Sequence, residues 1–234
     1  MGRDGMHTAA RALAALEVPL LLAVPLAMAV VCALDLAQAA ALTLGVTALV
    51  VILFFAGYEA SRPGLRQIMP TLVLAACAAA GRILFAPVPD FKPVSAIAIV
   101  AGAALGRRNG FMVGALAALC SNFFFGQGMW TPWQMYAWGL VGYLGGVLAQ
   151  AGAFKSRPAL LAYGFCSALL YGLVLNSYQA IGFVRPLTVP GVLASFASAL
   201  PFDLLHGFAT VVFLAVLYEP WTRRIGRVVE KYGL

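Results

Sequence analysis

Charge is scarce in this chain. Of its 234 residues, 15 are Lys or Arg and 8 are Asp or Glu, so 10% of the sequence is charged, against roughly 25% in soluble domains. Hydrophobic residues make up 63%. A domain of this length in water could not bury so much apolar surface, whereas a bilayer accepts it when helices satisfy the backbone. The composition excludes an ordinary soluble domain and predicts an all-α membrane protein.

Cysteine and histidine are sparse as well. The two histidines, His7 and His206, lie near opposite ends of the chain, so no metal site is predicted. A GxxxxGK[ST] loop is also missing, which argues against ATP binding by this chain itself, and we expect no cofactor. The cysteines lack CxxC spacing and are interpreted as small packing residues rather than disulfides. They are Cys32, Cys77, Cys120 and Cys166.

Eight apolar runs follow one another along the chain. About 17 to 25 apolar residues in a helix cross a hydrocarbon layer roughly 30 Å thick. The run at 94–106 is shorter and is bounded by Lys92-Pro93 and Arg107-Arg108, so we expect it to be tilted or partly buried by its neighbours. The sequence predicts a polytopic bundle of about eight transmembrane helices, at about 18–34, 41–57, 68–85, 94–106, 110–126, 133–150, 159–176 and 197–217.

The basic residues predict how these helices are oriented. Loops rich in Lys and Arg tend to stay in the cytoplasm, and with eight spans most of the basic residues fall on one side. Both termini are therefore expected to be cytoplasmic. The net charge of +7 then orients the chain rather than indicating nucleic-acid binding. The residues on this side are Arg3, Arg11, Arg62, Arg66, Arg107, Arg108, Lys155, Arg157, Arg223, Arg224, Arg227 and Lys231.

The N-terminus allows a second interpretation. Arg11 precedes an apolar stretch, and Leu36-Ala37-Gln38-Ala39 resembles the small-residue site at which a secretory signal is cleaved. Cleavage there would leave the topology of the remaining spans unchanged.

Three connections on the opposite side are rich in Pro, Gly, aromatic and amide residues. Pro and Gly fix turns, Trp and Tyr offer flat faces with a polar edge, and amides both donate and accept hydrogen bonds. Such residues suit a lid over a ring-bearing solute, although Trp130 and Trp133 also fit the aromatic belt of a membrane interface. The three are 86–93 with Asp90 and Lys92, the turn SNFFFGQGMWTPWQ with Asn122, Gln127 and Gln134, and a connection with Asn176, Tyr178, Gln179 and Arg185.

Ionisable residues inside the spans form another informative class, because each is costly there unless it is paired or hydrated. Arg82 lies about one turn from the outer end of its run, and Asp203 shares a helical face with His206. Counting about 1.5 Å per residue back from Pro220 places Asp203 at a depth similar to that of Arg82. We expect these two to approach each other near the outer mouth, either as a structural ion pair or as ligand groups.

Small residues recur at the spacing that lets helices approach closely. The pairs are Gly102 and Gly106, Gly110 and Gly114, and Gly142 and Gly146. In a chain rich in Ala and Gly these pairs predict ordinary close packing.

The order of motifs is similar to that of a known family. Arg82 is followed by PVPDFKPVSAIAIVAGAALG, then by GFMVGALAALCSNFFFGQGMWTPWQMYAWGLVGYLGGVL, and finally by LPFDLLHG and a C-terminal KYGL. Over roughly residues 66–234 this order resembles the substrate-binding S components of energy-coupling factor (ECF) vitamin importers. The resemblance implies a six-helix core at 66–218, preceded by an extension with two helices at 1–65 and followed by a basic cytoplasmic tail at 219–234.

The resemblance also implies a function. Such a subunit, in a prokaryotic cell membrane, binds a vitamin from outside and works with a transmembrane coupling subunit and two ATPase subunits. Cobalamin or a precursor is favoured and riboflavin is second, since long outer connections and few charges suit a large, mostly neutral ligand. Candidates for contact with the coupling subunit are Ala75, Ala76, Ala79 and Ala80. The expected substrate-binding residues are Arg82, Asp90, Lys92, Asn122, Gln127, Trp130, Trp133, Gln134, Asn176, Tyr178, Asp203 and His206.

Three other functions fit parts of the pattern. A self-sufficient secondary transporter would use an ion gradient and often contains an inverted internal repeat, and this sequence shows no convincing repeat. An intramembrane enzyme would need an acid–base pair, for which Asp203 and His206 are the candidates. A structural or assembly protein would need neither an ion gradient nor an acid–base pair. We therefore expect a transporter subunit rather than an enzyme.

Overall fold

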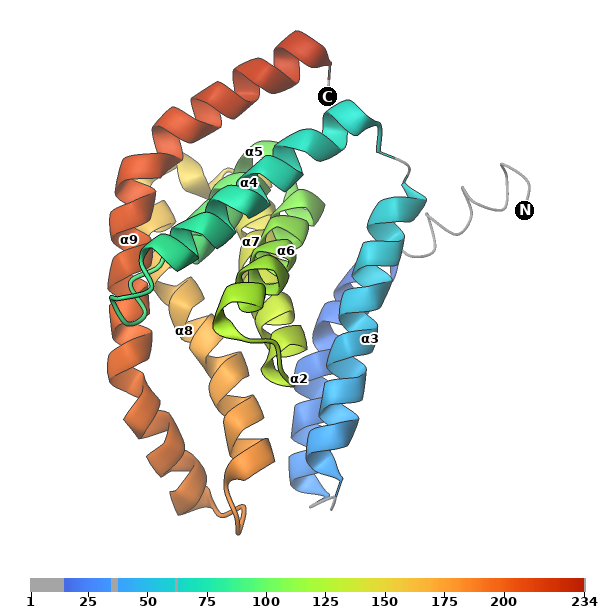
Figure 1. The fold of residues 1–234 in the computed structure, drawn as a ribbon, viewed down its shortest axis with the longest axis vertical. Coiled ribbons are helices and arrows are strands. Elements are labelled where there is room, and N and C mark those ends of the chain that lie inside the picture. The colour runs from blue at the N-terminus through green and yellow to red at the C-terminus, as the bar shows by residue number, and fades with distance from the viewer. Residues whose placement is uncertain (1–14, 35–37, 62, 234) are drawn as a thin grey trace, which may run out of the picture.

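The computed structural model describes residues 15–34, 38–61 and 63–233. Within them the fold is all-helical (Figure 1), which confirms the predicted all-α class. The helices are α2 (Glu17–Ala33), α3 (Ala39–Ala60), α4 (Leu65–Leu84), α5 (Val94–Leu105), α6 (Arg107–Phe125), α7 (Trp130–Gln150), the short 3-10 helix η1 (Ala153–Lys155), α8 (Arg157–Phe183) and α9 (Val189–Tyr232).

Each predicted apolar run overlaps one of the helices α2 to α9. Four helices, α3, α4, α8 and α9, are long and apolar enough to cross a membrane, and α2 and α5 are shorter apolar helices. These helices are compatible with a membrane location. The helix α8 extends beyond its predicted run, and α9 continues through most of the predicted basic tail, as far as Tyr232.

Helix α9 is much longer than a membrane is thick. Its 44 residues correspond to about 66 Å at roughly 1.5 Å per residue, whereas the hydrocarbon core measures roughly 30 Å. It contains Pro201 and Pro220, and a proline inside a helix removes a backbone hydrogen bond and favours a bend. Figure 1 shows the last turns of α9 bending across one end of the bundle, next to the start of α4.

The short helix α5 lies at the centre of the core. Every residue from Val94 to Gly102 is buried, and α5 contacts α4, α6, α7 and α9. Its 12 residues span about 18 Å, but a helix enclosed by protein does not need to match the bilayer. The expectation that this run is buried by its neighbours is confirmed.

Glycines bring α5, α6 and α7 into backbone contact. A Cβ atom on Gly142 would overlap the carbonyl group of Gly110, and one on Gly102 would overlap the carbonyl oxygen of Gly142. A Cβ atom on Gly146 would overlap the backbone of Arg107. The predicted close packing at the spaced glycines is confirmed for these three helices.

Two glycines also end helices. Gly106 alone separates α5 from α6 and has a φ of 93°, and Gly126 ends α6 with a φ of 98°. Positive φ is strained for residues that carry a Cβ atom. These positions let the chain reverse direction in one and four residues respectively, which keeps α5, α6 and α7 close together.

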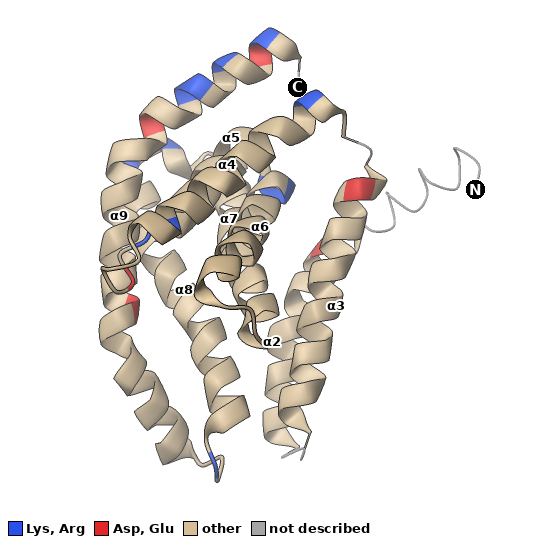
Figure 2. Ribbon diagram, viewed as in Figure 1, with Lys and Arg blue, Asp and Glu red and all other residues tan. Residues whose placement is uncertain are grey.

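Basic residues gather at one end of the bundle. Figure 2 shows Lys and Arg concentrated where α4 and α6 begin and where α9 ends. The connection between α8 and α9, which contains Arg185, lies at the far end. Arg3, His7, Arg11 and Arg62 lie outside the described residues, as do residues 36 and 37 of the possible cleavage site.

The four cysteines correct a prediction. All four are free and exposed on the outside of the bundle, so they do not fill gaps between helices. In an Ala-rich apolar helix, spacing alone does not show whether a small residue faces the core or the surrounding solvent. For this reason the sequence did not reveal their outward orientation.

Candidate functional site

Arg82 lies in the last turn of α4 and is half-buried. Its Nη1 atom donates hydrogen bonds of 2.6 Å to Ser121 Oγ and to Asn122 Oδ1. Its guanidinium carbon lies 4.6 Å from the ring centroid of Phe125 and 4.9 Å from that of Trp138, so the rings face the cation. Among the described residues no acidic side chain lies within 4.0 Å of Arg82. Its direct contacts are therefore with neutral groups, while the carboxylate of Asp90 acts on its charge from beyond 4.0 Å.

Amide side chains extend this network from α6 to α7. Asn122 Nδ2 donates to Gln134 Oε1 at 2.8 Å and to Thr131 Oγ1 at 3.1 Å. Thr131 Oγ1 donates to Gln127 Oε1 at 2.8 Å, and Gln127 Nε2 donates to the carbonyl oxygen of Leu119 at 2.9 Å. The fully buried Asn122 is thus satisfied by fixed partners, which holds both amides in one orientation.

His206 lies in the same cluster but is not paired with Asp203. Its Nε2 atom is 2.8 Å from Ser95 Oγ, which also accepts a hydrogen bond of 3.2 Å from Trp138 Nε1. The rings of His206 and Tyr171 form a T-shaped pair, with centroids 5.1 Å apart. The imidazole is buried. Its partner is therefore a hydroxyl group.

Trp138 links these groups into one cluster. It contacts Arg82, donates to Ser95 and stacks on Tyr171 with ring centroids 4.6 Å apart. The cluster then takes at least one side chain from each of the six helices α4 to α9. We call it the six-helix cluster, and its members are Arg82, Ser95, Asn122, Gln134, Trp138, Tyr171 and His206.

A second stacked pair joins α7 to α8. The rings of Trp133 and Tyr178 have centroids 5.3 Å apart and are inclined by 30°. Trp133 is fully buried, and its Nε1–H donor has no hydrogen-bond partner among the described residues. Buried polar groups are nearly always satisfied. An unused donor beside stacked rings is a feature that a ligand acceptor could complete.

Asp203 corrects the predicted approach to Arg82. Its Oδ2 atom accepts a hydrogen bond of 2.9 Å from Asn176 Nδ2, and its carboxylate lies against Gly172 of α8. No ion pair joins Asp203 to Arg82 among the described residues. The two residues have similar predicted depths, but Asp203 faces α8 whereas Arg82 faces α6.

The connection between α4 and α5 is closed by its own residues. Lys92 Nζ donates to the carbonyl oxygens of Phe85 at 2.6 Å and Val88 at 2.5 Å. Asp90 has a φ of 48°. Burial raises the pKa of the Asp90 carboxyl, against the positive charges of Lys92 and Arg82, and burial lowers the pKa of Lys92. Lys92 thus stabilises the turn through its backbone contacts.

The aromatic turn also differs from its prediction. Only residues 126–129 form the turn, because α6 ends at Phe125 and α7 begins at Trp130. Asn122 and Trp133 are fully buried between helices, whereas Trp130 is 42% exposed. Asn122, Trp133 and Gln134 therefore do not form an external lid. In the same way Asn176, Tyr178 and Gln179 belong to α8 rather than to a connection.

Sequence reasoning missed several members of the site. Ser95 is the one polar side chain of α5, so its position in an apolar run was a usable signal. Thr131, Gln134 and Trp138 follow at intervals of three and four residues, which places them on one face of α7. The missed residues are Ser95, Ser121, Phe125, Thr131, Trp138 and Tyr171.

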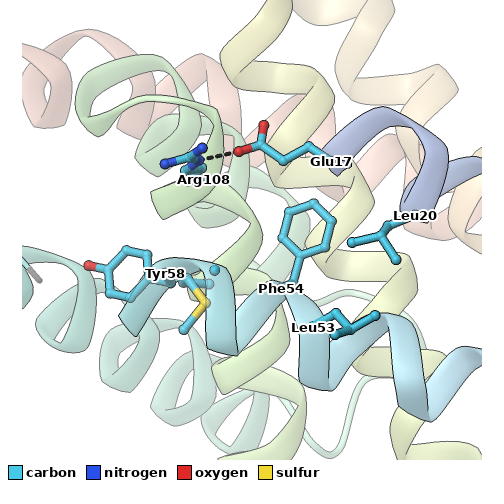
Figure 3. A pocket seen from close by; sticks show the side chains of 8 residues that line it. Glu17, Leu20, Leu53, Phe54, Tyr58 and Arg108 are labelled. Atoms are coloured by element: carbon cyan, nitrogen blue, oxygen red, sulfur yellow. Dashed lines mark hydrogen bonds and ion pairs between the residues drawn. The ribbon is translucent and has the colours of Figure 1, made fainter. Parts of the chain in front are cut away.

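A separate polar cluster lies near the basic end and joins the N-terminal helices to the core. The buried Glu17 of α2 pairs with Arg107 at 3.2 Å and with Arg108, and it accepts a hydrogen bond of 2.9 Å from Tyr143. Figure 3 shows Glu17 directed toward Arg108, with Phe54 of α3 nearby. The adjoining cavity of about 10 Å³ holds no more than about one water molecule. This cluster therefore attaches the N-terminal helices to the core.

The four alanines of α4 point in two directions. Ala75 and Ala79 are buried, with exposures of 3% and 6%, whereas Ala76 and Ala80 are exposed. Only the second pair lies on a surface that another protein could reach.

These observations define an all-helical protein whose apolar helices are compatible with a membrane location and enclose a polar and aromatic cluster. Residues 61–223 match the model of a protein family described as Family of unknown function (DUF6580). The match covers α4 to α8 and much of α9, so the chain belongs to this family. No curated protein and no solved structure matches the chain.

Proposed function

We propose that this chain is the substrate-binding S component of an ECF-type importer and binds a vitamin-like solute within the helices α4 to α9. The observation that carries the proposal is Arg82, a cation held by neutral partners and two rings inside an apolar bundle. A charge in such a position is costly and is commonly functional in membrane proteins. A solute that carries an anionic or electron-rich oxygen would compensate it.

The chemistry of the surroundings indicates the class of solute. Stacked aromatic pairs favour a flat ring system, and the amides Asn122 and Gln134 can exchange their hydrogen bonds for bonds to ring substituents. The unused Nε1–H of Trp133 supplies a further donor. Cobalamin or a precursor stays the first candidate and riboflavin the second.

The proposal includes eight membrane spans with both termini in the cytoplasm. Its support is the gathering of Lys and Arg at one end of the bundle, since basic loops tend to stay in the cytoplasm. The coupling subunit would contact the exposed Ala76 and Ala80 of α4, and the two ATPase subunits would hydrolyse ATP.

Native mass spectrometry and ligand titration test this proposal. Purified protein is incubated separately with cobalamin and riboflavin, and bound mass and affinity are measured for the wild type and for Arg82→Gln. We expect one of the two to bind and Arg82→Gln to weaken binding at least tenfold. Arg157→Gln is the matched control, because Arg157 is an exposed arginine at the start of α8, outside the six-helix cluster. This variant should bind like the wild type.

The proposal fails if neither compound binds to protein that elutes as a single folded species in gel filtration, or if Arg82→Gln binds as tightly as the wild type. Uptake by the purified chain alone in liposomes, driven by a proton or sodium gradient, would instead identify a secondary transporter.

An intramembrane enzyme is the second candidate because Ser95 and His206 form a hydroxyl–imidazole pair at 2.8 Å. A histidine in this position can act as a general base toward a serine. Labelling of the wild type by a fluorophosphonate probe, and its loss in Ser95→Ala, would support the enzyme. An absence of labelling would count against it.

A further inference from the structure

A groove separates the first half of α4 from the last turns of α9. It encloses about 490 Å³, within the roughly 300–1,000 Å³ of small-molecule sites. Its walls are mostly apolar side chains, among them Val73 of α4 and Ile225 and Val228 of α9. Arg66 and Arg224 line it as well. The groove therefore combines an apolar surface with two cations.

The end of α9 has the pattern of a helix that lies at a membrane surface. Trp221, Ile225, Val228 and Tyr232 recur at intervals of three and four residues and form one apolar face. Trp221 and Ile225 pack on the hydrophobic core, whereas Val228 and Tyr232 are 41% and 50% exposed. A basic amphipathic helix of this kind lies along the headgroup region of a bilayer. Such a helix position would put the groove at the level where lipid headgroups meet acyl chains.

The two arginines of the groove have no acidic partner. Arg223 pairs with Glu219 at 3.0 Å, but within residues 15–34, 38–61 and 63–233 neither Arg66 nor Arg224 forms an ion pair. Both are exposed, and they lie at the end of the bundle where basic residues gather (Figure 2). Guanidinium groups match the geometry of phosphate oxygens. Their charge complements an anionic headgroup.

We propose that this groove binds an anionic phospholipid, with the phosphate between Arg66 and Arg224 and an acyl chain along Val73 and Val228. The apolar walls account for the acyl chain, and the unpaired cations account for a preference over zwitterionic lipids. This site lies apart from the six-helix cluster, and it does not depend on the proposed transport function.

Lipid retention measured by native mass spectrometry tests the proposal. Full-length protein in detergent is mixed with phosphatidylglycerol or with phosphatidylcholine of the same chain length, and the fraction carrying one lipid is recorded. We expect the wild type to retain phosphatidylglycerol at least fivefold more than phosphatidylcholine. The double variant Arg66→Gln/Arg224→Gln should lose this preference.

Two further variants separate the groove from general surface charge. Arg223→Gln/Arg227→Gln removes the same net charge from residues that do not line the groove, and it should retain the lipid within twofold of the wild type. Val228→Trp keeps every arginine but fills the groove, and it should reduce retention at least threefold. Each variant is first checked by gel filtration and thermal unfolding.

Three results would overturn the proposal. They are equal retention of the two lipids by the wild type, an equal loss in the two arginine double variants, and unchanged retention in Val228→Trp. The second would indicate attraction by surface charge alone, and the third would leave the groove to an occupant other than a lipid.

Discussion

The guanidinium carbon of Arg82 lies 4.9 Å from the ring centroid of Trp138. This contact joins the end of α4 to the middle of α7. The same tryptophan donates to Ser95 of α5 and stacks on Tyr171 of α8, so it also connects these two helices. A single aromatic side chain thus touches a cation, a hydroxyl group and a second ring. Such a contact constrains the rotation of several helices at once, and its loss should lower the stability of the whole core.

Replacing Trp138 by Ala should destabilise the fold by about 3–5 kcal/mol, the usual cost of removing a buried Trp. The change also leaves Ser95 without its indole donor and Arg82 without one of its rings. Thermal or denaturant unfolding in detergent measures the effect. Trp130→Ala, in the same helix at a position that is 42% exposed, should cost less than half as much. Equal losses in the two variants would show that the contacts of Trp138 have no special weight.

The positions of the helices along the chain were predictable from the sequence, whereas the rotation of each helix about its own axis was not. Apolar runs located the helices, and the glycine spacing located the close contacts of α5, α6 and α7, because both depend on local sequence. The pairing of Asp203 depends on the direction in which α9 faces. Depth alone placed Asp203 level with Arg82, but Asn176 of α8 is its partner.

The candidate site shows the same division. Arg82 and His206 stood out because ionisable groups are rare in apolar runs, and Asn122 and Gln134 stood out as amides of the aromatic turn. Ser95 was visible as the one polar residue of an apolar run, but only the packed structure brings Ser95 and Tyr171 to Trp138. The same limit applies to Ala76 and Ala75, adjacent residues whose opposite exposure depends on how α4 is rotated.

Replacing Gly142 by Ala should weaken the core. The added Cβ atom would overlap the backbone of Gly110, and such overpacking costs about 1–3 kcal/mol. Gly182→Ala is the matched control, since a Cβ atom there has nothing within 4 Å and alanine favours a helix by up to about 1 kcal/mol. Unfolding in detergent should therefore show opposite shifts, and a gain in stability for Gly142→Ala would contradict the close approach of α6 and α7.

Replacing Glu17 by Gln should loosen the attachment of α2 to the core. The change removes the negative charge that faces Arg107 and Arg108. Breaking a fully buried pair costs roughly 3–5 kcal/mol, but these arginines are partly exposed, so about 2–3 kcal/mol is expected. Glu219→Gln removes an exposed i,i+4 pair with Arg223 and should cost about 0.5 kcal/mol or less. Comparable losses in both variants would mean that Glu17 does not anchor α2.

Asp90 should make stability depend on pH. Burial raises the pKa of its carboxyl in the folded protein, while in the unfolded chain this pKa is about 3.9. The folded state therefore binds this proton more tightly. Its stabilising contribution is fully present below the unfolded pKa and is lost as the pH rises through the folded pKa. Ionised Asp90 then lowers the free energy of unfolding at neutral pH.

Replacing Asp90 by Asn tests this directly, because the amide resembles the protonated carboxyl and has no charge to bury. Asn also tolerates the positive φ of 48° at this position, which adds a gain in the free energy of unfolding that does not vary with pH. The difference in the free energy of unfolding between variant and wild type should therefore grow as the pH rises from about 4 toward 7. A series of unfolding curves in detergent at several pH values measures the slope. A difference that stays constant, or that shrinks with rising pH, would show that the Asp90 carboxyl is not destabilised by burial.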